Sequence, residues 1–192
     1  RTGFAPQILH CNGWHTAFGP LLLDAEYAQD PLFSGTRSVL TIHNIGYQGI
    51  FDARQVADLG LADPHWLHQD DLRAGIVNAL KHGILYAHAV TTVSPTYARE
   101  ICTAEYGMGL EQVLRARGSA VAGILNGVDY DEWDPRRDRH LPIHYDEHTL
   151  GAKAELKRTF LARQGLPFRL GVPLFGIVSR LEKRGLIDRY AD

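Results

Sequence analysis

The chain has 192 residues, of which 45% are hydrophobic and 22% are charged, and its formal net charge is −2. This composition is that of an ordinary globular protein. It argues against a nucleic-acid binder, since no Lys/Arg block is present, and no apolar run is long enough to span a membrane. Two cysteines, Cys11 and Cys102, are too few for a disulfide framework, so we expect a reducing cytoplasmic location.

Hydrophobic periodicity and turn residues predict a series of short strands and helices. In chain order we expect a strand at 7–11, a helix at 14–27 kinked or starting late at Gly19-Pro20, a strand at 39–42, a short helix at 55–59, a helix at 76–87, a strand at 89–93, a helix from the N-cap Ser94 to Cys102, a helix at 110–117 and a strand at 121–125. Strands that alternate with helices are typical of an α/β fold with a doubly wound parallel sheet.

The second part of the chain has a different amino-acid composition. Residues 129–145 are rich in Pro, Asp, Arg and His and predict an irregular connector. An amphipathic helix is expected at 149–164, with Ala152, Leu156 and Phe160 on its apolar face. Residues 173–179 form an apolar run that predicts the first strand of a second α/β domain.

Polar residues follow several predicted strands, and ligands of open α/β sheets bind beyond the carboxyl ends of the strands. The candidate positions are His43-Asn44, Ser94, Asn126-Gly127 and Arg180. Amide and imidazole groups suit sugar hydroxyls, and an Arg guanidinium suits a phosphate. The alternative is that Asn44 and Gly46 only make a turn, that His43 is a satisfied core histidine, and that Asn126-Gly127 is a turn as well.

Other kinds of site have weaker support. The pair Gly107 and Gly109 lacks the third glycine of a dinucleotide-binding loop, and no phosphate-binding P-loop is present. Three histidines, His140, His144 and His148, recur every four residues, but Pro142 lies among them, so we expect a loop rather than a metal site.

The chain resembles the bacterial-type glycogen and starch synthases, retaining glucosyltransferases that use ADP-glucose to extend α-1,4-glucan. The resemblance covers nearly the whole chain, in the order of that family. Its most specific segments are HNIGYQGIF at 43–51, TTVSPTYAREI at 91–101 and GILNGVDYDEW at 123–133.

The resemblance implies an internal fragment of a two-domain GT-B-type glycosyltransferase. Residues 1–128 would be the second half of the N-terminal domain, residues 129–170 the interdomain connector and helix, and residues 171–192 the truncated start of the C-terminal domain. The implied ligands are ADP-glucose and α-glucan, with no cofactor, metal, nucleic acid or membrane. The oligomeric state is left open.

The resemblance also implies roles for individual residues. His43 would lie beside the donor glucose, and Arg180 would bind the ADP phosphates. The implied substrate-binding residues are Asn44, Tyr47, Gln48, Asn126, Gly127, Lys183 and Arg184. Exposed aromatic side chains such as those of Tyr47 or Tyr106 could meet the glucan, with ordinary packing as the alternative.

Two departures from the family pattern bear on activity. Gly13 stands where the family's first motif has an Asp that lines the cleft. The segment after Arg180 lacks one residue of the family pattern, so that Lys183 and Arg184 only approximate the phosphate-binding Lys. A non-catalytic glucan- or nucleotide-sugar-binding remnant is therefore the alternative function, and a related glycosyltransferase or phosphorylase with another donor is a third.

Overall fold

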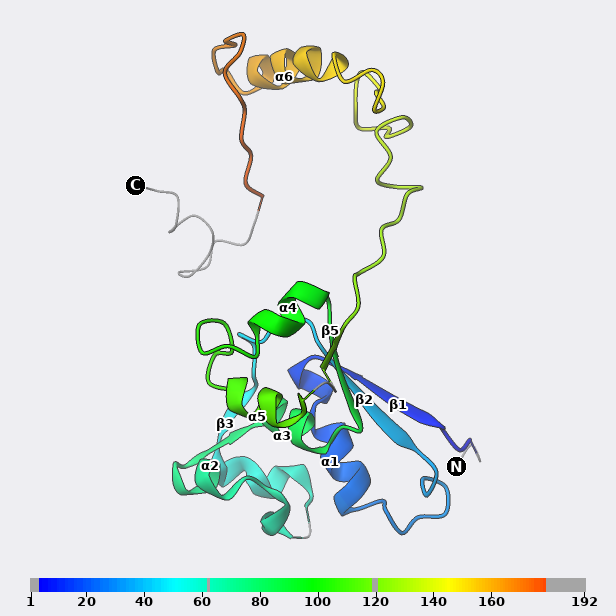
Figure 1. The fold of residues 1–192 in the computed structure, drawn as a ribbon, viewed down its shortest axis with the longest axis vertical. Helices are drawn as coiled ribbons and strands as arrows, with labels where there is room; N and C mark the ends of the chain where they lie inside the picture. Colours follow the sequence, from blue (N-terminus) through cyan, green and yellow to red (C-terminus); the bar gives the residue numbers. More distant parts are fainter. Residues whose placement is uncertain (1–3, 62, 119–120, 179–192) are drawn as a thin grey trace. The chain divides into compact units, whose positions relative to one another are not determined.

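The computed structural model describes residues 4–61, 63–118 and 121–178, and the chain forms two compact units, Arg1–Gly127 and Val128–Asp192 (Figure 1). No helix in the described ranges is both long and apolar enough to cross a membrane.

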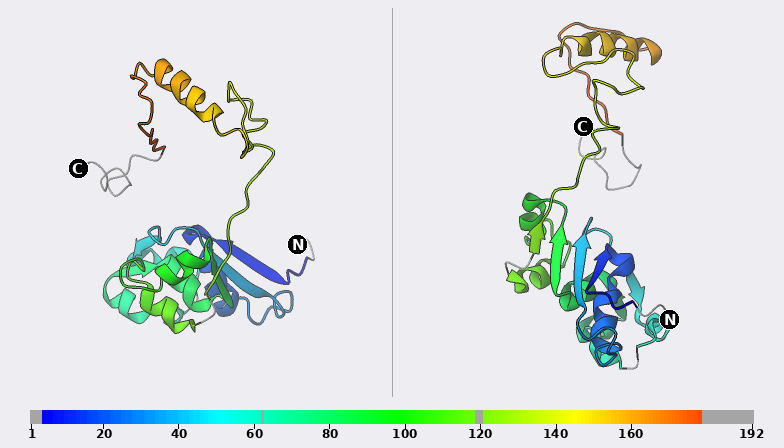
Figure 2. Two further views of the ribbon diagram at one scale, coloured as in Figure 1. Left: turned by 45° about the horizontal axis from the view of Figure 1, so that its top comes forward. Right: turned by 90° about the vertical axis from the view of Figure 1, so that its right-hand side faces the viewer.

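A four-stranded parallel sheet forms the centre of the first unit. Its strands are β1 (Ile8–Asn12), β2 (Arg37–Ile42), β5 (Ala89–Thr92) and β6 (Val121–Gly123), in the order β1-β2-β5-β6. Figure 2 shows β1, β2 and β5 side by side. The predicted α/β class with a parallel sheet is confirmed, and so are the four predicted strands, with ends shifted by one to two residues.

Helices cover one face of this sheet. They are α1 (Phe18–Ala25), α3 (Ala79–Tyr86), α4 (Pro95–Glu100) and α5 (Glu111–Ala116), with the short α2 (Gln69–Arg73) and the 3-10 turns η1 (Trp14–Thr16), η2 (Ala53–Leu59) and η3 (Pro64–Trp66). The strand order advances in one direction, so right-handed crossovers place the connecting helices on the same side. Consistent with one layer, α3 contacts both α1 and α5.

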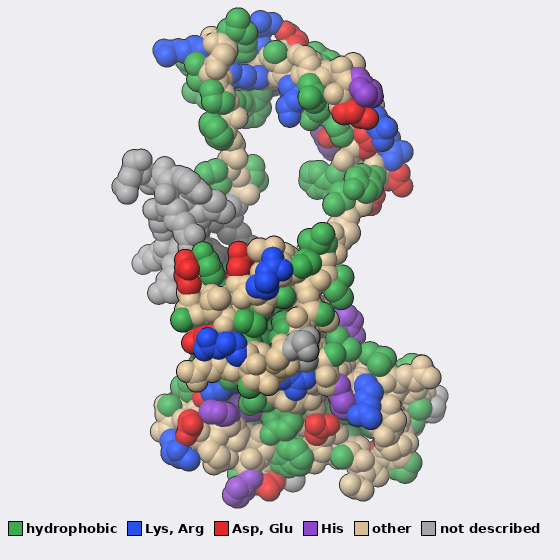
Figure 3. Space-filling model, in the orientation of Figure 1, with side chains coloured by type: hydrophobic (Ala, Val, Ile, Leu, Met, Phe, Trp, Pro, Cys, Tyr) green, Lys and Arg blue, Asp and Glu red, His purple; other side chains and the backbone are tan. Residues whose placement is uncertain are grey.

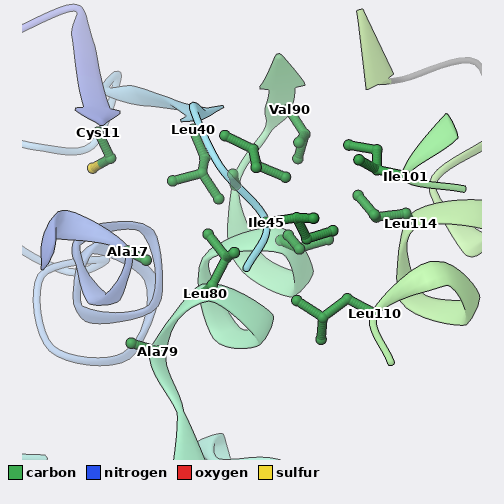
Figure 4. Close-up of a cluster of buried hydrophobic side chains, with 13 residues drawn as sticks. Cys11, Ala17, Leu40, Ile45, Ala79, Leu80, Val90, Ile101, Leu110 and Leu114 are labelled. Atoms are coloured by element: carbon green, nitrogen blue, oxygen red, sulfur yellow. The ribbon is translucent and has the colours of Figure 1, made fainter. Parts of the chain in front are cut away.

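The core lies between the sheet and this helical layer. Leu40 and Val90 point from adjacent strands toward Leu80 of α3 and toward Ile101 and Leu114, all fully buried (Figure 4). Each fully buried side chain of this size contributes about 1.5–3 kcal/mol relative to an exposed one. The core therefore fixes the sheet against α3, whose first turn adjoins the candidate site.

The opposite face of the sheet is more open and carries a row of hydrogen-bonded polar side chains. His10 Nε2 lies 2.7 Å from Thr41 Oγ1, which lies 2.7 Å from Thr91 Oγ1 on the next strand. The neighbouring Cys11 is buried on the helical face, as alternation along a strand requires. His10 and Cys11 therefore lie on opposite faces of the sheet.

The helix predicted over residues 76–87 is wrong at its start. Residues Ile76–Asn78 form strand β4, which pairs antiparallel with β3 (Ile50–Asp52), and α3 begins only at Ala79. Asn78 ends the strand because its Oδ1 accepts a hydrogen bond from the Lys81 N–H, which makes it the N-cap of α3. The apolar stripe of the helix does include the buried Leu80 and Ile84.

Three other helix predictions are confirmed with changes. The segment 14–27 divides into η1 and α1, with Gly19-Pro20 in the first turn of α1, which is the expected late start. Ser94 is the N-cap of α4, since its side chain accepts from the N–H groups of Thr96 and Tyr97. The short helix near 55–59 is the 3-10 turn η2.

The second unit contains helix α6 (Ala152–Arg163), near the predicted range. Its predicted apolar face is wrong in part, because Phe160 is half exposed and Leu161 is the buried residue. The centroid of the Phe168 ring lies 5.3 Å from Lys157 Nζ and 4.7 Å from Arg158 Cζ, on the helix face that also carries Leu161. Upstream, the Arg136 guanidinium and N–H bind Asp134 and lower the pKa of this carboxyl to about 2.

The strand predicted at 173–179 is absent from its described part, residues 173–178. A strand needs a neighbouring strand for its N–H and C=O groups, and no such neighbour exists among the described residues. Phe175, Ile177 and Val178 are consequently exposed. Figure 3 shows hydrophobic side chains at the surface of the second unit.

Gly83 allows α3 to approach the sheet and the end of η1 closely. A Cβ at this position would lie 2.8 Å from the Ala17 carbonyl oxygen and 2.9 Å from Leu40 Cδ2. We predict that Gly83→Ala lowers the free energy of unfolding by about 1–3 kcal/mol through overpacking, despite the higher helix propensity of Ala.

Chemical denaturation of the chain measures this effect. The matched control is Gly35→Ala, where no atom lies within 4 Å of the added Cβ, and its stability should change by less than about 0.5 kcal/mol. Equal stability of the two variants would contradict the packing seen at Gly83.

Candidate functional site

The candidate site lies at the carboxyl edge of the parallel sheet, where His43 follows β2 and Asn12 ends β1. His43 Nε2 lies 2.9 Å from Asn12 Oδ1. Donation of this hydrogen bond by His43 fixes the proton on Nε2 and leaves Nδ1 as the acceptor nitrogen of the ring. Both side chains are exposed, so His43 is a surface group and not the satisfied core histidine of the alternative interpretation.

Asn44 begins a tight turn after His43. Its Oδ1 accepts a 2.9 Å hydrogen bond from the Gly46 N–H, and its backbone carbonyl accepts from the Tyr47 N–H. This side-chain turn is the local structure that Asn favours. For Asn44 and Gly46 the turn alternative is therefore what the structure shows, and a contact of Asn44 with substrate stays a prediction.

The loop 44–49 is fixed to the helices on both of its sides. The Ile45 N–H donates to the hydroxyl of Tyr97 in α4, and the Ile45 side chain is buried. The backbone carbonyls of Gln48 and Gly49 accept from the first two N–H groups of α3, each at 2.9 Å. These N–H groups have no partner within their own helix, so the loop satisfies them and is held in place by them.

Gln48 links the loop to two further segments through its side chain. Its Oε1 accepts from Asn78 Nδ2 at 2.6 Å, and its Nε2 donates to the Met108 carbonyl at 3.0 Å. Both ends of the carboxamide thus bind protein groups. The predicted contact of Gln48 with substrate remains a prediction, while its structural role is to join three segments.

Gly49 packs against the indole of Trp14 beyond the end of β1. Its φ is 62°, and an added Cβ would lie 2.3 Å from Trp14 Cε3, so only glycine fits here. Next to this contact is a hollow of about 450 Å³ whose walls include Trp14, Tyr47, Ile50 and Met108. Tyr47 is 44% exposed there.

The remaining predicted residues lie elsewhere on the edge or outside the described ranges. Asn126 and Gly127 follow β6 and are exposed, and no hydrogen bond within the described ranges joins Asn126 to His43. Ser94 lies at the same edge, but its hydroxyl is used as the helix cap. Arg180, Lys183 and Arg184 lie outside the described residues.

Gly13 adopts a backbone conformation that is almost restricted to glycine, with φ 67° and ψ −178°. Its N–H donates to the Thr41 carbonyl at 2.9 Å, which extends the pairing of β1 with β2. An Asp at this position would be strained in this backbone. The residue that departs from the family motif is thus also one whose backbone conformation, in the turn that leads to Trp14, favours glycine.

A buried polar cluster lies behind the loop. Lys81 Nζ is 2.6 Å from Asp71 Oδ1 and 3.1 Å from His68 Nδ1. The fully buried His82 bonds the Asn78 carbonyl through Nδ1 at 2.7 Å and accepts from the His68 N–H through Nε2 at 2.9 Å. Through the hydrogen bond from His82, the cluster holds Asn78 in place, and Asn78 in turn bonds Gln48.

Within the described ranges, no group of three or more His, Cys, Asp or Glu residues is placed to hold a metal ion. The segment with His140, His144 and His148 is irregular, so the four-residue spacing does not align the rings on a helix. His144 instead lies 3.0 Å from the Asp138 carbonyl oxygen through Nε2.

The sequence located His43 but missed its partner. Nothing in the local sequence indicates that the Asn12 amide reaches a residue 31 positions away. Trp14, Asn78 and Met108 were also missed. The available signal was the pair of glycines on both sides of Met108, because glycines mark a tight turn. In that turn Met108 has a positive φ of 52°.

The pH dependence of stability should report the buried His82. Burial lowers the pKa of this ring, and protonation would also turn Nε2, which accepts from a backbone N–H, into a donor. The unfolded chain takes up the proton at the ordinary histidine pKa of about 6.5. The contribution of His82 to the free energy of unfolding is therefore fully present above that pH. It is lost as the pH drops below it, by up to about 1.4 kcal/mol per pH unit.

Denaturation between neutral and mildly acidic pH measures this slope. His82→Gln should flatten it, because an amide does not titrate and can make both hydrogen bonds. An unaltered slope in the His82→Gln variant would contradict the account.

The family model described as starch synthase catalytic domain matches residues 1–116. Glycogen synthase from Anaeromyxobacter sp. (strain Fw109-5) is 45% identical over 185 residues, which are 96% of this chain and 39% of that protein. Glycogen synthase 1 from Geobacter sulfurreducens is 44% identical, over 99% of this chain and 38% of that protein.

A solved structure gives the same result. The catalytic domain of starch synthase IV from Arabidopsis thaliana, bound to ADP and acarbose, matches with a TM-score of 0.73 and 38% identity over 86% of this chain and 34% of that one. This chain thus spans about two fifths of the length of the curated relatives above. The family model and these relatives together show that the chain belongs to the glycogen and starch synthase family.

Proposed function

We propose that this chain supplies part of the active site of an enzyme that transfers glucose, with retention of configuration, from ADP-glucose to the non-reducing end of an α-1,4-glucan. The observation that carries the proposal is the exposed His43–Asn12 pair, placed by the sheet at its carboxyl edge within the family's HNIGYQG segment. An imidazole and an amide can together orient the hydroxyls of a sugar.

In this proposal the two parts of the chain have different tasks. His43 and Asn126 orient the glucosyl unit, and Arg180, with Lys183 or Arg184 beside it, neutralises the departing diphosphate. Positive side chains that stabilise developing charge require no metal ion or other cofactor. The ADP in the Arabidopsis structure supports ADP as the leaving group here. The two free cysteines fit the cytoplasm, where we expect such an enzyme.

One observation favours a second function. By the resemblance, Gly13 stands where the family has a cleft carboxylate, and its backbone conformation is almost restricted to glycine. A chain that binds a glucan or a nucleotide sugar without transferring glucose would tolerate that loss, since binding depends less on a single group than catalysis does.

The test is transfer of labelled glucose from ADP-glucose to glycogen. The assay uses this chain alone and a chimera in which the chain replaces the matching segment of a related glycogen synthase. We expect activity only in the chimera, because transfer needs both walls of the cleft to exclude water. His43→Ala in the chimera should lower kcat about 100-fold through misplacement of the glucosyl unit.

His65→Ala is the matched control, because His65 is exposed and bonds only its own turn residue Asp63, and it should keep full activity. A chimera that folds and binds ADP-glucose but transfers nothing would favour the binding function. Unchanged kcat in the His43→Ala variant would remove His43 from the site.

A further inference from the structure

Asparagine followed by glycine occurs twice in the chain, at Asn12-Gly13 and at Asn126-Gly127. This dipeptide is chemically reactive, because the backbone nitrogen of the glycine can attack the side-chain amide carbon of the asparagine. A glycine favours the attack, since it has no side chain to obstruct the approach. Asparagine is accordingly among the thermolabile residues of proteins. The hydrogen bonds that hold each dipeptide decide whether the attack can occur.

The fold holds Asn12-Gly13 at both of the groups that would react. The Asn12 side chain is bonded through Oδ1 to His43 Nε2 at 2.9 Å, and the Asn12 N–H donates to Thr16 Oγ1 at 2.7 Å. The Gly13 N–H, which carries the attacking nitrogen, donates to the Thr41 carbonyl at 2.9 Å. The pairing of β1 with β2 would have to open before this nitrogen could react, so the fold protects the dipeptide.

The dipeptide Asn126-Gly127 is in the opposite condition. It follows β6, whose pairing continues only to the Ile124 N–H, which donates to the Thr92 carbonyl at 2.8 Å. Residues 124–129 form no helix, strand or turn, and every residue from 124 to 133 is exposed. No hydrogen bond within the described ranges engages the Asn126 side chain or the Gly127 N–H. Both reacting groups are therefore open to solvent and to each other.

We propose that Asn126 is a site of spontaneous modification, at which deamidation produces aspartate and isoaspartate. The Gly127 nitrogen gives up its proton to water and forms a bond with Asn126 Cγ, and the Cγ–Nδ2 bond breaks as ammonia leaves. Water then opens the resulting cyclic imide at one of its two carbonyl carbons. Opening at the main-chain carbon gives isoaspartate, and opening at Cγ gives aspartate. The reaction consumes water and releases ammonia, with no oxidation or reduction.

The modification changes the chemistry of the candidate site. It replaces a neutral amide by a carboxylate, and isoaspartate also lengthens the main chain by one methylene group. The consequence for activity, unlike the modification itself, rests on the proposed function, in which Asn126 orients the glucosyl unit. A new negative charge beside a departing diphosphate opposes the charge stabilisation on which the transfer depends. Deamidation should therefore inactivate the site progressively.

Incubation of the chain at mildly alkaline pH, followed by mass spectrometry of tryptic peptides, tests the site directly. Trypsin leaves Asn12 in the peptide 2–37 and Asn126 in the peptide 118–136, so the two dipeptides are measured separately. We expect Asn126 to lose its amide at least about tenfold faster than Asn12, because reaction at Asn12 requires local opening of the fold. In urea the two rates should become alike, since neither dipeptide is then held by hydrogen bonds.

The variant Gly127→Ala tests the attack by the backbone nitrogen. No atom lies within 4 Å of a Cβ added at Gly127, so the fold accommodates the methyl group, which obstructs the approach to Asn126. We expect the loss of the Asn126 amide to slow about tenfold. The matched control is Gly151→Ala, where the added Cβ also meets no atom within 4 Å, and it should leave the rate unchanged.

Three results would overturn the modification site. They are equal loss of amide at the two asparagines of the folded chain, slower loss at Asn126 than at Asn12, and an unchanged rate in the Gly127→Ala variant. Each of these results would leave the proposed function intact, because glucosyl transfer does not require the modification.

The effect on transfer is measured in the chimera, incubated until a known fraction of Asn126 is modified. We expect kcat to fall in proportion to that fraction. Modification without loss of transfer would remove Asn126 from the proposed donor site and leave the modification site intact. A chimera that is inactive before incubation would overturn the proposed transfer alone, since the modification is measured in the chain itself.

Discussion

The first turn of α3 holds the loop on which the candidate site depends. Its N–H groups at Ala79 and Leu80 donate to the carbonyls of Gly49 and Gln48, and the helix itself is fixed by the buried Leu80 between the sheet and its neighbours. An unpaired buried N–H costs about 1–3 kcal/mol, so helix and loop stabilise each other. The geometry of His43, Tyr47 and the hollow follows from this one junction.

The local sequence pattern was sufficient to predict most strands of the sheet, but it did not predict the junction between the loop and α3. The run at 39–42 and the Ser94-Pro95 cap depend on neighbours in sequence, and both were predicted correctly. Strand β4 was predicted as helix, because its apolar residues fit a helical stripe and its partner β3 lies more than 20 residues upstream. The run at 173–178 fits a strand by composition, but strand formation needs a partner that the described residues do not supply.

The site shows the same division. Position along the chain predicted that His43 would stand at a strand end, and motif similarity indicated its chemistry. The partner amide of Asn12 and the bridge from Gln48 to Met108 join segments 31 and 60 residues apart, and only the packed sheet and helices bring them together. The resemblance drew attention to Gly13 as a departure, and the structure adds that its backbone conformation is almost restricted to glycine.

Amide hydrogen exchange at the junction tests the central claim most directly. The N–H groups of Ala79 and Leu80 would be compared with that of Leu40 in the middle of β2 and with exposed turn amides of the same unit. A loop that is fixed to the helix predicts slow exchange at both positions, near the rate of Leu40. Exchange as fast as in the exposed turns would mean that the loop leaves the helix readily, and would contradict a preformed site at this edge of the sheet.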